Sequence, residues 1–260
     1  MENNTPTTDG LEVRSYFVRH RNALLARADF GELYVDYYLH LSENKIKVAA
    51  NHDLLFKETL AALTLYLASR PHDVMAAWTV NFQSPPVNIF AVGDNETRSV
   101  TGRVFSENVK RADHNFFHAN VLRGVKPSHS GSVEFTTGGI FAAVEQYCLQ
   151  NEKSVTRFFQ FAEEDYVMIS AQPDCDLDWL NALTNDDIRT LDQREQLRLL
   201  EQRRYRWHCG CDEQRMTSLL ASQIRRNPTS FANNEPPFQV DCPRCGAQHT
   251  VSREALEKHL

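Results

Sequence analysis

The chain has 260 residues, of which 42% are hydrophobic and 24% are charged, and these proportions are ordinary for a globular protein. This length predicts one large domain or two smaller ones. The 34 acidic residues outnumber the 28 basic residues, and the net charge of −6 disfavours nonspecific nucleic-acid binding by the chain as a whole.

Membrane-spanning and secretory segments are not expected in this sequence. No run of about 18 apolar residues occurs, and the polar start MENNTPTTDG lacks the basic and apolar stretches of a signal peptide. We expect residues 1–10 to form a disordered tail. The lack of both segments predicts a cytoplasmic protein, and the cytoplasm keeps cysteine thiols reduced.

Residues 11–175 predict an α+β core domain, which begins with a strand at 11–22 and continues with helices at 32–42 and 51–70. Alternation of apolar and polar residues from 74 to 105, interrupted by turn residues, predicts an antiparallel meander. In the second helix the spacing of four apolar residues places them on one face: Phe56, Leu60, Leu63 and Leu67.

The rest of the core is expected to extend this sheet and pack helices against it. We predict a strand at 131–136, a helix at 139–150, and a hairpin formed by 154–162 and 166–171. The region 106–130 is expected to be a loop. Its scattered histidines could bind a metal but are more simply explained as solvated side chains: His114, His118 and His129.

Residues 176–206 are predicted to form a charged helical linker. A short helix at 176–184 leads into a segment, 186–206, in which eleven of the 21 residues are charged and few are apolar. Its helix propensity is good, but a helix with so little to bury depends on its neighbours for stability. The segment is therefore either an ordinary solvated connector or a linker that is close to unfolding.

Four cysteines at the C-terminal end predict a metal site. Cys209-Gly210-Cys211 is followed after 30 residues by Cys242-Pro243-Arg244-Cys245. Tetrahedral Zn²⁺ is commonly bound by two close pairs of thiolates from separate segments. Gly246, directly after the last cysteine, allows a tight turn around the metal. We therefore expect one Zn²⁺ per chain, bound by Cys209, Cys211, Cys242 and Cys245.

The segment 207–260 has few other means of holding a fold. Strands are expected around Phe238 and Val240 and at Thr250 and Val251, and an amphipathic helix should end before Asn227-Pro228. The helix is indicated by Met216, Leu219, Leu220 and Ile224. A metal is a natural way to stabilise so small a unit.

Other roles for these cysteines are weaker. A lone Cys-x-x-Cys can be a thioredoxin-like redox pair, but that motif opens a helix, and Gly246-Ala247-Gln248 does not resemble a helix start. His208 and His249 flank the site and are possible substitute ligands. Cys148 and Cys175 have no partner at ligand spacing, and we expect Cys148 to be a buried apolar residue.

This arrangement resembles the thirty-three-kilodalton heat-shock protein family. The resemblance rests on Cys-x-Cys and Cys-x-x-Cys about thirty residues apart, behind a charged linker and a mixed core. The stretch 130–161 also looks like the family's strand, helix and following strand, with Gln150-Asn151-Glu152-Lys153 at its turn. The chain would be a divergent member, since the family's early Arg-Gly pattern is replaced by Arg21-Asn22-Ala23.

The resemblance implies a redox-regulated holdase chaperone that responds to oxidative stress, and it makes 207–260 a zinc-binding redox-switch domain. Members of this family bind zinc through the four cysteines in the reduced, inactive state. On oxidation we expect disulfides between near neighbours, Cys209 with Cys211 and Cys242 with Cys245, together with zinc release. Loss of the domain should free the linker to hold unfolded or partly unfolded client proteins. The resemblance also implies a homodimer in the active state.

Three other functions remain open at this point. A nucleic-acid-binding zinc protein is disfavoured, because 207–260 has six basic and six acidic residues. An enzyme is disfavoured because no phosphate loop, Gly-x-Ser-x-Gly or His-Glu-x-x-His motif occurs, so we predict no catalytic residue. The main alternative is a purely structural zinc clip in a protein whose core has another role.

Overall fold

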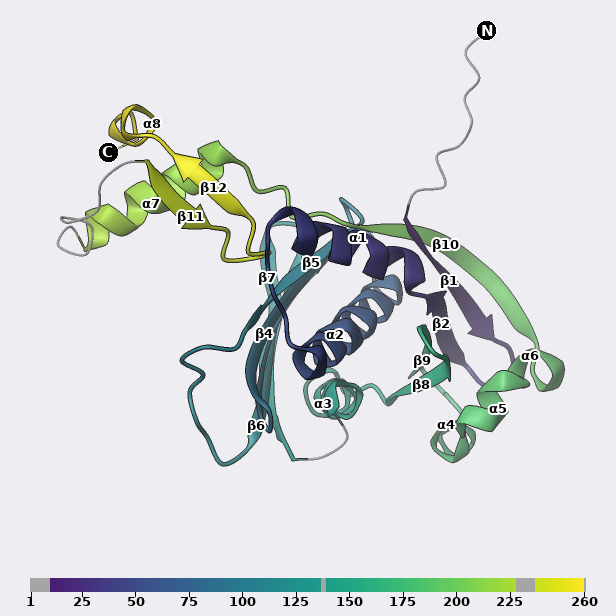
Figure 1. Ribbon diagram of the computed structural model, residues 1–260. Coiled ribbons are helices and arrows are strands. Elements are labelled where there is room, and N and C mark those ends of the chain that lie inside the picture. The colour runs from purple at the N-terminus through teal and green to yellow at the C-terminus, as the bar shows by residue number, and fades with distance from the viewer. Residues whose placement is uncertain (1–9, 137–138, 228–236, 260) are drawn as a thin grey trace, which may run out of the picture.

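The computed structural model describes residues 10–136, 139–227 and 237–259. The expected tail at 1–10 therefore lies outside the described residues, apart from Gly10. Ten strands form one sheet, and a separate two-stranded sheet lies near the C-terminus (Figure 1). Among the described helices, none is long and apolar enough to cross a membrane.

The first half of the large sheet is a run of antiparallel strands. Its order is β7 (Lys126–Phe135), β6 (Asn115–Arg123), β3 (Val74–Gln83), β4 (Pro86–Asp94) and β5 (Ser99–Phe105). Along β3 every second side chain is buried, which is the pattern of a strand with one face on a core. The predicted meander over 74–105 is confirmed.

The second half of the sheet contains the first strand of the core and the last. Its order is β10 (Leu197–Trp207), β1 (Leu11–Val18), β2 (Ala23–Asp29), β9 (Asp165–Ala171) and β8 (Thr156–Ala162), with every neighbouring pair antiparallel. Strands β8 and β9 form the predicted hairpin. Strand β10 is thus a member of the core sheet, although it lies just before the first cysteine pair.

The two halves meet at a short junction. Strand β10 runs parallel to β5 and pairs with it at only two positions, Arg206 with Ser99 and Trp207 with Val100. By contrast, β10 is paired with β1 along eight positions. We call this β5–β10 contact the seam, and it is the narrowest point of the ten-stranded sheet.

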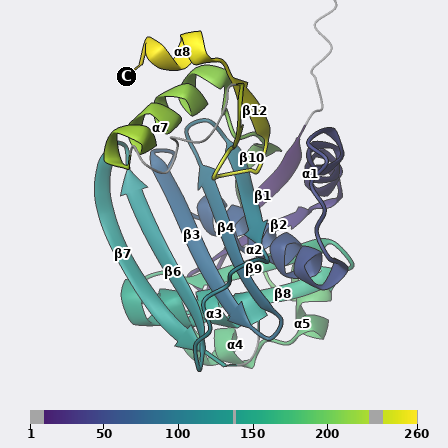
Figure 2. The ribbon, with the colours of Figure 1, turned by 60° about the vertical axis from the view of Figure 1, so that its left-hand side comes forward.

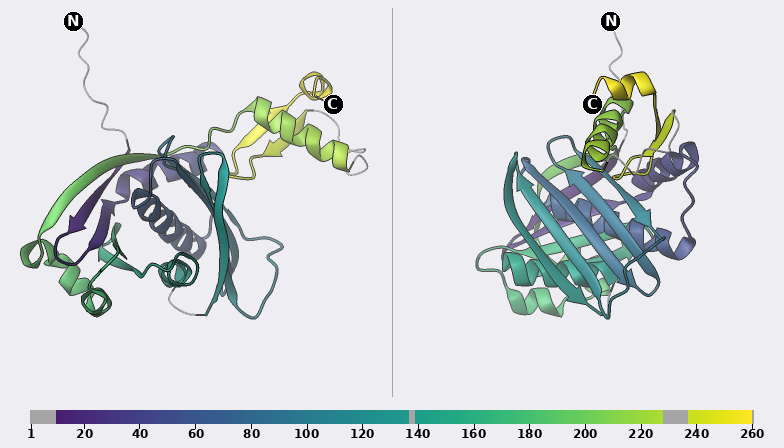
Figure 3. Two further views of the ribbon diagram at one scale, coloured as in Figure 1. Left: turned by 180° about the vertical axis from the view of Figure 1, so that it is seen from behind. Right: turned by 90° about the vertical axis from the view of Figure 1, so that its left-hand side faces the viewer.

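Three helices fill the space enclosed by the two halves: α1 (Gly31–Glu43), α2 (Ala50–Ala68) and α3 (Gly139–Tyr147), the last continued by a π-helical turn, Cys148–Glu152 (Figures 1 and 3). From Thr59 to Ala68 every residue of α2 is buried. The predicted apolar face of this helix is confirmed, but its second half is enclosed on all sides, as expected for a helix at the centre of a core.

A second, smaller core lies beneath β8, β9 and β2. It is covered by three short helices, α4 (Leu177–Ala182), α5 (Asn185–Arg189) and α6 (Leu191–Arg194). Leu180 and Ile188 are buried there. Thr184 and Asp187 form a capping box that fixes the start of α5.

The C-terminal elements form a separate unit, which we call the cysteine module (residues 208–259, as far as they are described). It comprises α7 (Glu213–Arg226), β11 (Phe238–Asp241), β12 (Gln248–Val251) and α8 (Arg253–Glu257). It lies at one end of the strands of the first half-sheet (Figure 2). The helix and both strands expected here are present, and α7 ends at Arg226, before Asn227.

The predicted α+β class, with an antiparallel sheet, packed helices and a C-terminal four-cysteine cluster, is confirmed. The helix predicted across 186–206 is wrong in its second half, which is strand β10. Its Leu, Arg, Glu and Gln residues favour helix, but Arg203 and Tyr205 are buried while Arg204 and Arg206 are exposed. Pairing with β1 and burial on one face override the local propensity.

The loop predicted at 106–130 is correct for residues 106–114 but wrong from Asn115 onward, because β6 and the start of β7 lie there. In β6 the buried side chains are Phe117, Ala119 and Val121. Polar His118 and Asn120 alternate with them, so the period of a half-buried strand is present in the sequence, although the small Ala119 weakens it. Strand β2 was not predicted either, and the strand expected at 11–22 ends at Val18.

Candidate metal centre

The first cysteine pair follows directly from the end of β10. The backbone N–H of His208 still donates to the Val100 carbonyl of β5 (3.1 Å), after which the chain turns through Gly210 at a left-handed φ of 65°. Asp212 then accepts a hydrogen bond from the N–H of Arg215 (2.7 Å) and starts α7. Cys209 and Cys211 are therefore held between the seam and a capped helix.

The second pair lies in the turn between β11 and β12. The Cys242 N–H donates to the Ala247 carbonyl, and the Gly246 N–H donates to the Cys242 carbonyl, each at 2.8 Å. Gly246 has a φ of 79°, which favours glycine, and a Cβ there would lie 3.0 Å from Ile46 Cδ1. The glycine expected to allow the turn thus also allows close contact with the core.

The four sulfurs form a compact cluster. Cys209 Sγ lies 3.7 Å from Cys242 Sγ, and Cys211 Sγ lies 3.6 Å from Cys245 Sγ. All four lie within 4.8 Å of one another. Four thiolates held tetrahedrally at about 2.3 Å from an ion stand roughly 3.8 Å apart, so this spacing suits a metal ion. The sequence prediction that these four residues come together is correct in geometry.

Crowding shifts the pKa values of these thiols in opposite directions. Hydrogen bonds from Cys209 and Cys245 lower the pKa of Cys242. The bond to Cys242 raises the pKa of Cys209, and bonds to Cys209 and then to Cys242 raise the pKa of Cys245. Burial raises the pKa of Cys211 to about 12. Four adjacent sulfurs cannot all ionise unaided, whereas a divalent cation favours the fully deprotonated set.

The cysteine module has only a small apolar core. Its cluster has eight buried residues, and two of these are cysteines of the centre; the members are Met216, Leu220, Ala221, Cys242, Cys245, Ala247, Val251 and Leu256. The sulfur cluster therefore lies within the packing that joins α7, α8 and the two short strands. Metal binding and folding of this unit should be closely linked.

Polar contacts attach the module to the core. The Arg103 guanidinium of β5 donates to the Cys242 carbonyl (3.1 Å) and pairs with the Asp241 carboxylate (3.1 Å). His40 of α1 donates its Nε2–H to the Cys245 carbonyl (2.9 Å), because a carbonyl can only accept. Both bonds reach the backbone of the second cysteine turn. The sequence carried no signal for Arg103 or His40.

Trp207 connects the core and the module through apolar contact. Its ring lies 5.3 Å from the Tyr37 ring, 5.3 Å from that of His40 and 6.1 Å from that of Phe56, measured between centroids. It also packs against the apolar cluster of the module. The last residue of β10 therefore contacts α1, α2 and the surroundings of the cysteines.

A polar cluster attaches β10 to the end of α2. The buried Arg203 side chain donates to the carbonyls of Arg70 (2.7 Å) and Leu67 (3.3 Å), where a cation stabilises the helix C-terminus. The Tyr205 hydroxyl donates to Asn95 (2.7 Å). We call Arg203, Tyr205 and Asn95 the latch. It holds β10 with hydrogen bonds where a strand usually presents apolar side chains.

The remaining sequence candidates lie elsewhere. Cys148 is buried in the core, and burial raises its pKa to about 12, which keeps the thiol protonated and unreactive. Cys175 is half-buried and packs against the smaller core. His118 and His129 lie on strands, where His118 contacts Ser132 and His129 contacts Glu152 (3.0 Å). The structure does not bring these groups to the cysteine centre.

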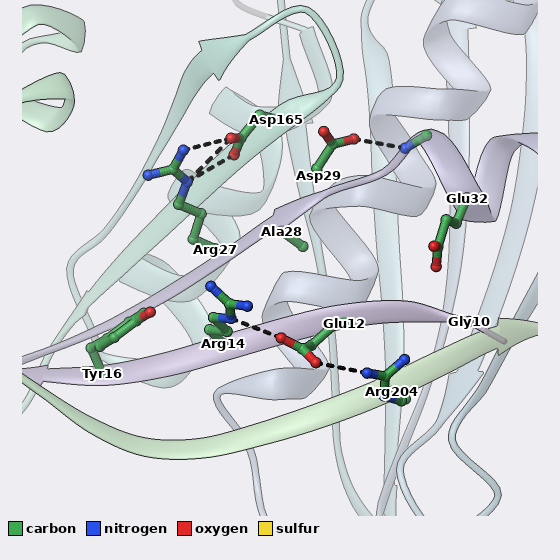
Figure 4. A pocket seen from close by; sticks show the side chains of 11 residues that line it. Gly10, Glu12, Arg14, Tyr16, Arg27, Ala28, Asp29, Glu32, Asp165 and Arg204 are labelled. Atoms are coloured by element: carbon green, nitrogen blue, oxygen red, sulfur yellow. Dashed lines mark hydrogen bonds and ion pairs between the residues drawn. The ribbon is translucent and has the colours of Figure 1, made fainter. Parts of the chain in front are cut away.

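A large hollow lies on the outer face of β10, β1 and β2 and is lined mainly by charged side chains (Figure 4). Its arginines are paired with acids: Arg14 and Arg204 with Glu12, and Arg27 with Asp165. The paired charges reduce its attraction for a charged ligand.

Comparison with known proteins supports these features. Residues 168–252, which include all four cysteines, match the family model described as Hsp33 protein. The fold is similar to the crystal structure of the 33 kDa chaperonin (heat shock protein 33 homolog) from Thermotoga maritima, with a TM-score of 0.68 and 10% identity over 96% of this chain and 97% of that chain. No curated protein matches the sequence.

Fold and site define an α+β protein with a C-terminal four-cysteine cluster that can hold a metal ion. The family match spans this cluster and the structural match spans almost the whole chain, and together they support the Hsp33 family. The resemblance noted in the sequence is thereby confirmed. The members of that family are chaperones.

Proposed function

We propose that this protein is a redox-regulated holdase, whose zinc-bound cysteines keep it inactive in the reducing cytoplasm. The ligands are Cys209, Cys211, Cys242 and Cys245, and the bound Zn²⁺ cross-links the two segments and neutralises their thiolate charge. The observation that carries the proposal is the position of this cluster, directly after β10 and against the seam. We divide the chain into a core (11–175), a linker (176–206) and a redox-switch domain (207–260).

Oxidation supplies the trigger. We propose disulfides between Cys209 and Cys211 and between Cys242 and Cys245. Each forms when two thiolates give up two electrons, and hydrogen peroxide accepts these electrons with two protons and leaves as two waters. Each disulfide closes a very short loop and leaves the first pair unlinked to the second, so the module loses its cross-link without gaining an equivalent one.

Loss of the module then acts on β10. Arg103, His40 and Trp207 contact the module close to the two residue pairs of the seam. Without these contacts, the seam is held only by its own few hydrogen bonds. The latch remains, but it consists of polar groups that water can replace at modest cost. Release of the C-terminal end of β10 from β5 would expose apolar residues that it now covers.

Unfolded or partly unfolded proteins are the partners that suit such a surface. Trp207 and the buried Tyr37 of α1 would become accessible, and α1 already exposes Val35, Tyr38 and Leu39. Apolar surface holds clients, and the many charges of the linker keep the complex in solution. We further propose a homodimer in the oxidised state and no enzymatic, nucleic-acid or membrane role.

The test follows zinc and chaperone activity in one sample. Reduced, zinc-loaded protein is treated with hydrogen peroxide, zinc release is measured with a chromogenic indicator, and light scattering reports aggregation of a denatured test protein diluted into the sample. We expect zinc release and suppressed scattering together, both reversed by a thiol reductant with added zinc. Zinc release without suppression would instead support the structural clip.

A matched variant separates the centre from the other cysteines. Cys175→Ser removes a half-buried thiol outside the cluster and should leave both responses unchanged. Cys242→Ser should abolish stoichiometric zinc binding and remove the peroxide dependence. If Cys175→Ser, and not Cys242→Ser, changes the response, the assigned switch residues are wrong.

A further inference from the structure

One nitrogen donor lies beside the sulfur cluster without belonging to it. His249 is on β12, opposite Val240 of β11, and its Nε2 lies 3.3 Å from Cys211 Sγ. The ring is half-buried. Its nitrogen lies outside the group of four sulfurs that are mutually within 4.8 Å. The hydrogen bond therefore reaches one edge of the cluster, at the second sulfur of the first pair.

The other histidine near the site is placed differently. His208 lies between β10 and Cys209, and its ring packs against Gly210. Among the described residues, no hydrogen bond joins His208 to a cysteine sulfur. The two histidines flanking the cysteines thus offer a natural comparison, with one in contact with a sulfur and the other not.

Imidazole chemistry gives His249 two uses at this position. With the proton on Nε2 the ring can donate to the Cys211 sulfur, which lies within hydrogen-bond distance. With the proton on Nδ1, the Nε2 lone pair becomes a ligand, and three cysteines with one histidine are a common zinc set. The change needs only a tautomer exchange through solvent and a short movement of the ring.

We propose that His249 is a reserve ligand of the metal centre. It donates to Cys211 while four sulfurs bind the metal, and it takes the place of Cys211 when that sulfur is no longer available. The inference rests on the proposed function only for the presence of a metal ion. It makes the two pairs unequal, because loss of Cys211 can be compensated from β12.

Cobalt is the probe, because Co²⁺ replaces Zn²⁺ and its visible absorption reports the ligand atoms. The variants are Cys211→Ser, the double variant Cys211→Ser/His249→Gln, and the matched control Cys211→Ser/His208→Gln. Each is titrated with Co²⁺ under reducing conditions, and affinity is taken from competition with a chelator. Circular dichroism checks that the core is folded in every variant.

We expect Cys211→Ser to bind one Co²⁺ with bands at shorter wavelength than the wild type, since nitrogen replaces sulfur. Adding His249→Gln to Cys211→Ser should remove the nitrogen contribution to the Co²⁺ spectrum and weaken Co²⁺ binding at least about tenfold. Adding His208→Gln should change neither the spectrum nor the affinity. Equal spectra and affinities for Cys211→Ser and Cys211→Ser/His249→Gln would overturn the inference and leave the proposed function intact. A wild type that binds no Co²⁺ or Zn²⁺ would overturn both.

A single variant decides the matter if the double variant does not fold. His249→Gln keeps all four thiolates and should transfer zinc to a chelator about tenfold faster than the wild type, whereas His208→Gln should match the wild type. Equal rates for His249→Gln and His208→Gln would overturn the inference.

Discussion

The core and the cysteine module differ in what holds them together. In the core, α2 is enclosed between the two half-sheets, and Trp78 is fully buried against the rings of Tyr66 and Phe117. In the module, two of only eight buried residues in the apolar cluster are cysteines of the centre. Apolar burial is indifferent to oxidants, whereas thiolates are not. One chain can therefore contain a durable scaffold and a chemically sensitive attachment.

The largest expected effect comes from removing one ligand. Cys242→Ser should cost the module most of a metal-binding free energy of roughly 10–16 kcal/mol, which exceeds what its small apolar cluster can supply. Hydrogen exchange followed by mass spectrometry should show lost protection in α7 and β11, with α2 unchanged. Cys175→Ser is the control. Retained protection in α7 would mean that apolar packing alone folds the module.

A substitution in the core should destabilise the core and leave the cysteine module intact. Trp78→Ala should destabilise the core by about 3–5 kcal/mol, because a fully buried indole leaves a cavity. Urea unfolding measured by circular dichroism gives the free energy of unfolding, and zinc content should remain at one per chain. Loss of zinc from Trp78→Ala in the absence of urea, while its core is still folded, would show that the regions are not energetically separate.

A substitution at the contact between the core and the cysteine module should have a smaller effect. Arg103→Met removes the hydrogen bond to the Cys242 carbonyl and the pair with Asp241, and we expect about 1–2 kcal/mol of loosening. Faster exchange at the second cysteine turn, with zinc retained, is the readout. Arg14→Met breaks an exposed pair with Glu12 and is the matched control, with little expected effect. An equal response in both variants would argue against a specific anchor.

The smallest effect concerns pH and stays within the core. Burial raises the pKa of Glu58, so the folded state binds this proton more tightly than the unfolded state does. Its stabilising contribution is present at low pH and is lost as pH rises through the raised pKa. Glu58→Gln should therefore be more stable than the wild type at pH 7 and equal to it below about pH 4.

Urea unfolding at both pH values checks this expectation. Glu32→Gln removes an exposed charge from α1 and is the control. A Glu58→Gln variant that is less stable than the wild type at pH 7 would show that the carboxylate has a partner worth more than its burial costs.

The sequence predicted the features that depend on local spacing. Two cysteine pairs suffice to predict a metal centre, because a thiolate has few other uses at such a density. Helix α2 and the strands β3 to β5 were also predictable, since their apolar residues keep a regular period. In each case the information lies within a segment shorter than about forty residues.

Strand β10 and two contacts of the second cysteine turn were missed because they depend on distant partners. Strand β10 buries Arg203 where an apolar residue would reveal a strand, and that arginine is acceptable only because the carbonyls of Arg70 and Leu67 lie opposite. Arg103 and His40 reach the cysteine turn from 139 and 205 residues away along the chain. No local pattern marks such positions, because their partners are defined only by the fold.

The position of β10 between β5 and β1 affects the order in which the sheet can form during synthesis. The ribosome makes β1 first, yet its neighbour β10 emerges only at residues 197–207, so a nascent chain ending before then presents β1 and β5 as bare edges. Closure of the sheet must wait until translation has almost reached the cysteines. The core sheet and the cysteine module are thus completed one directly after the other during biosynthesis.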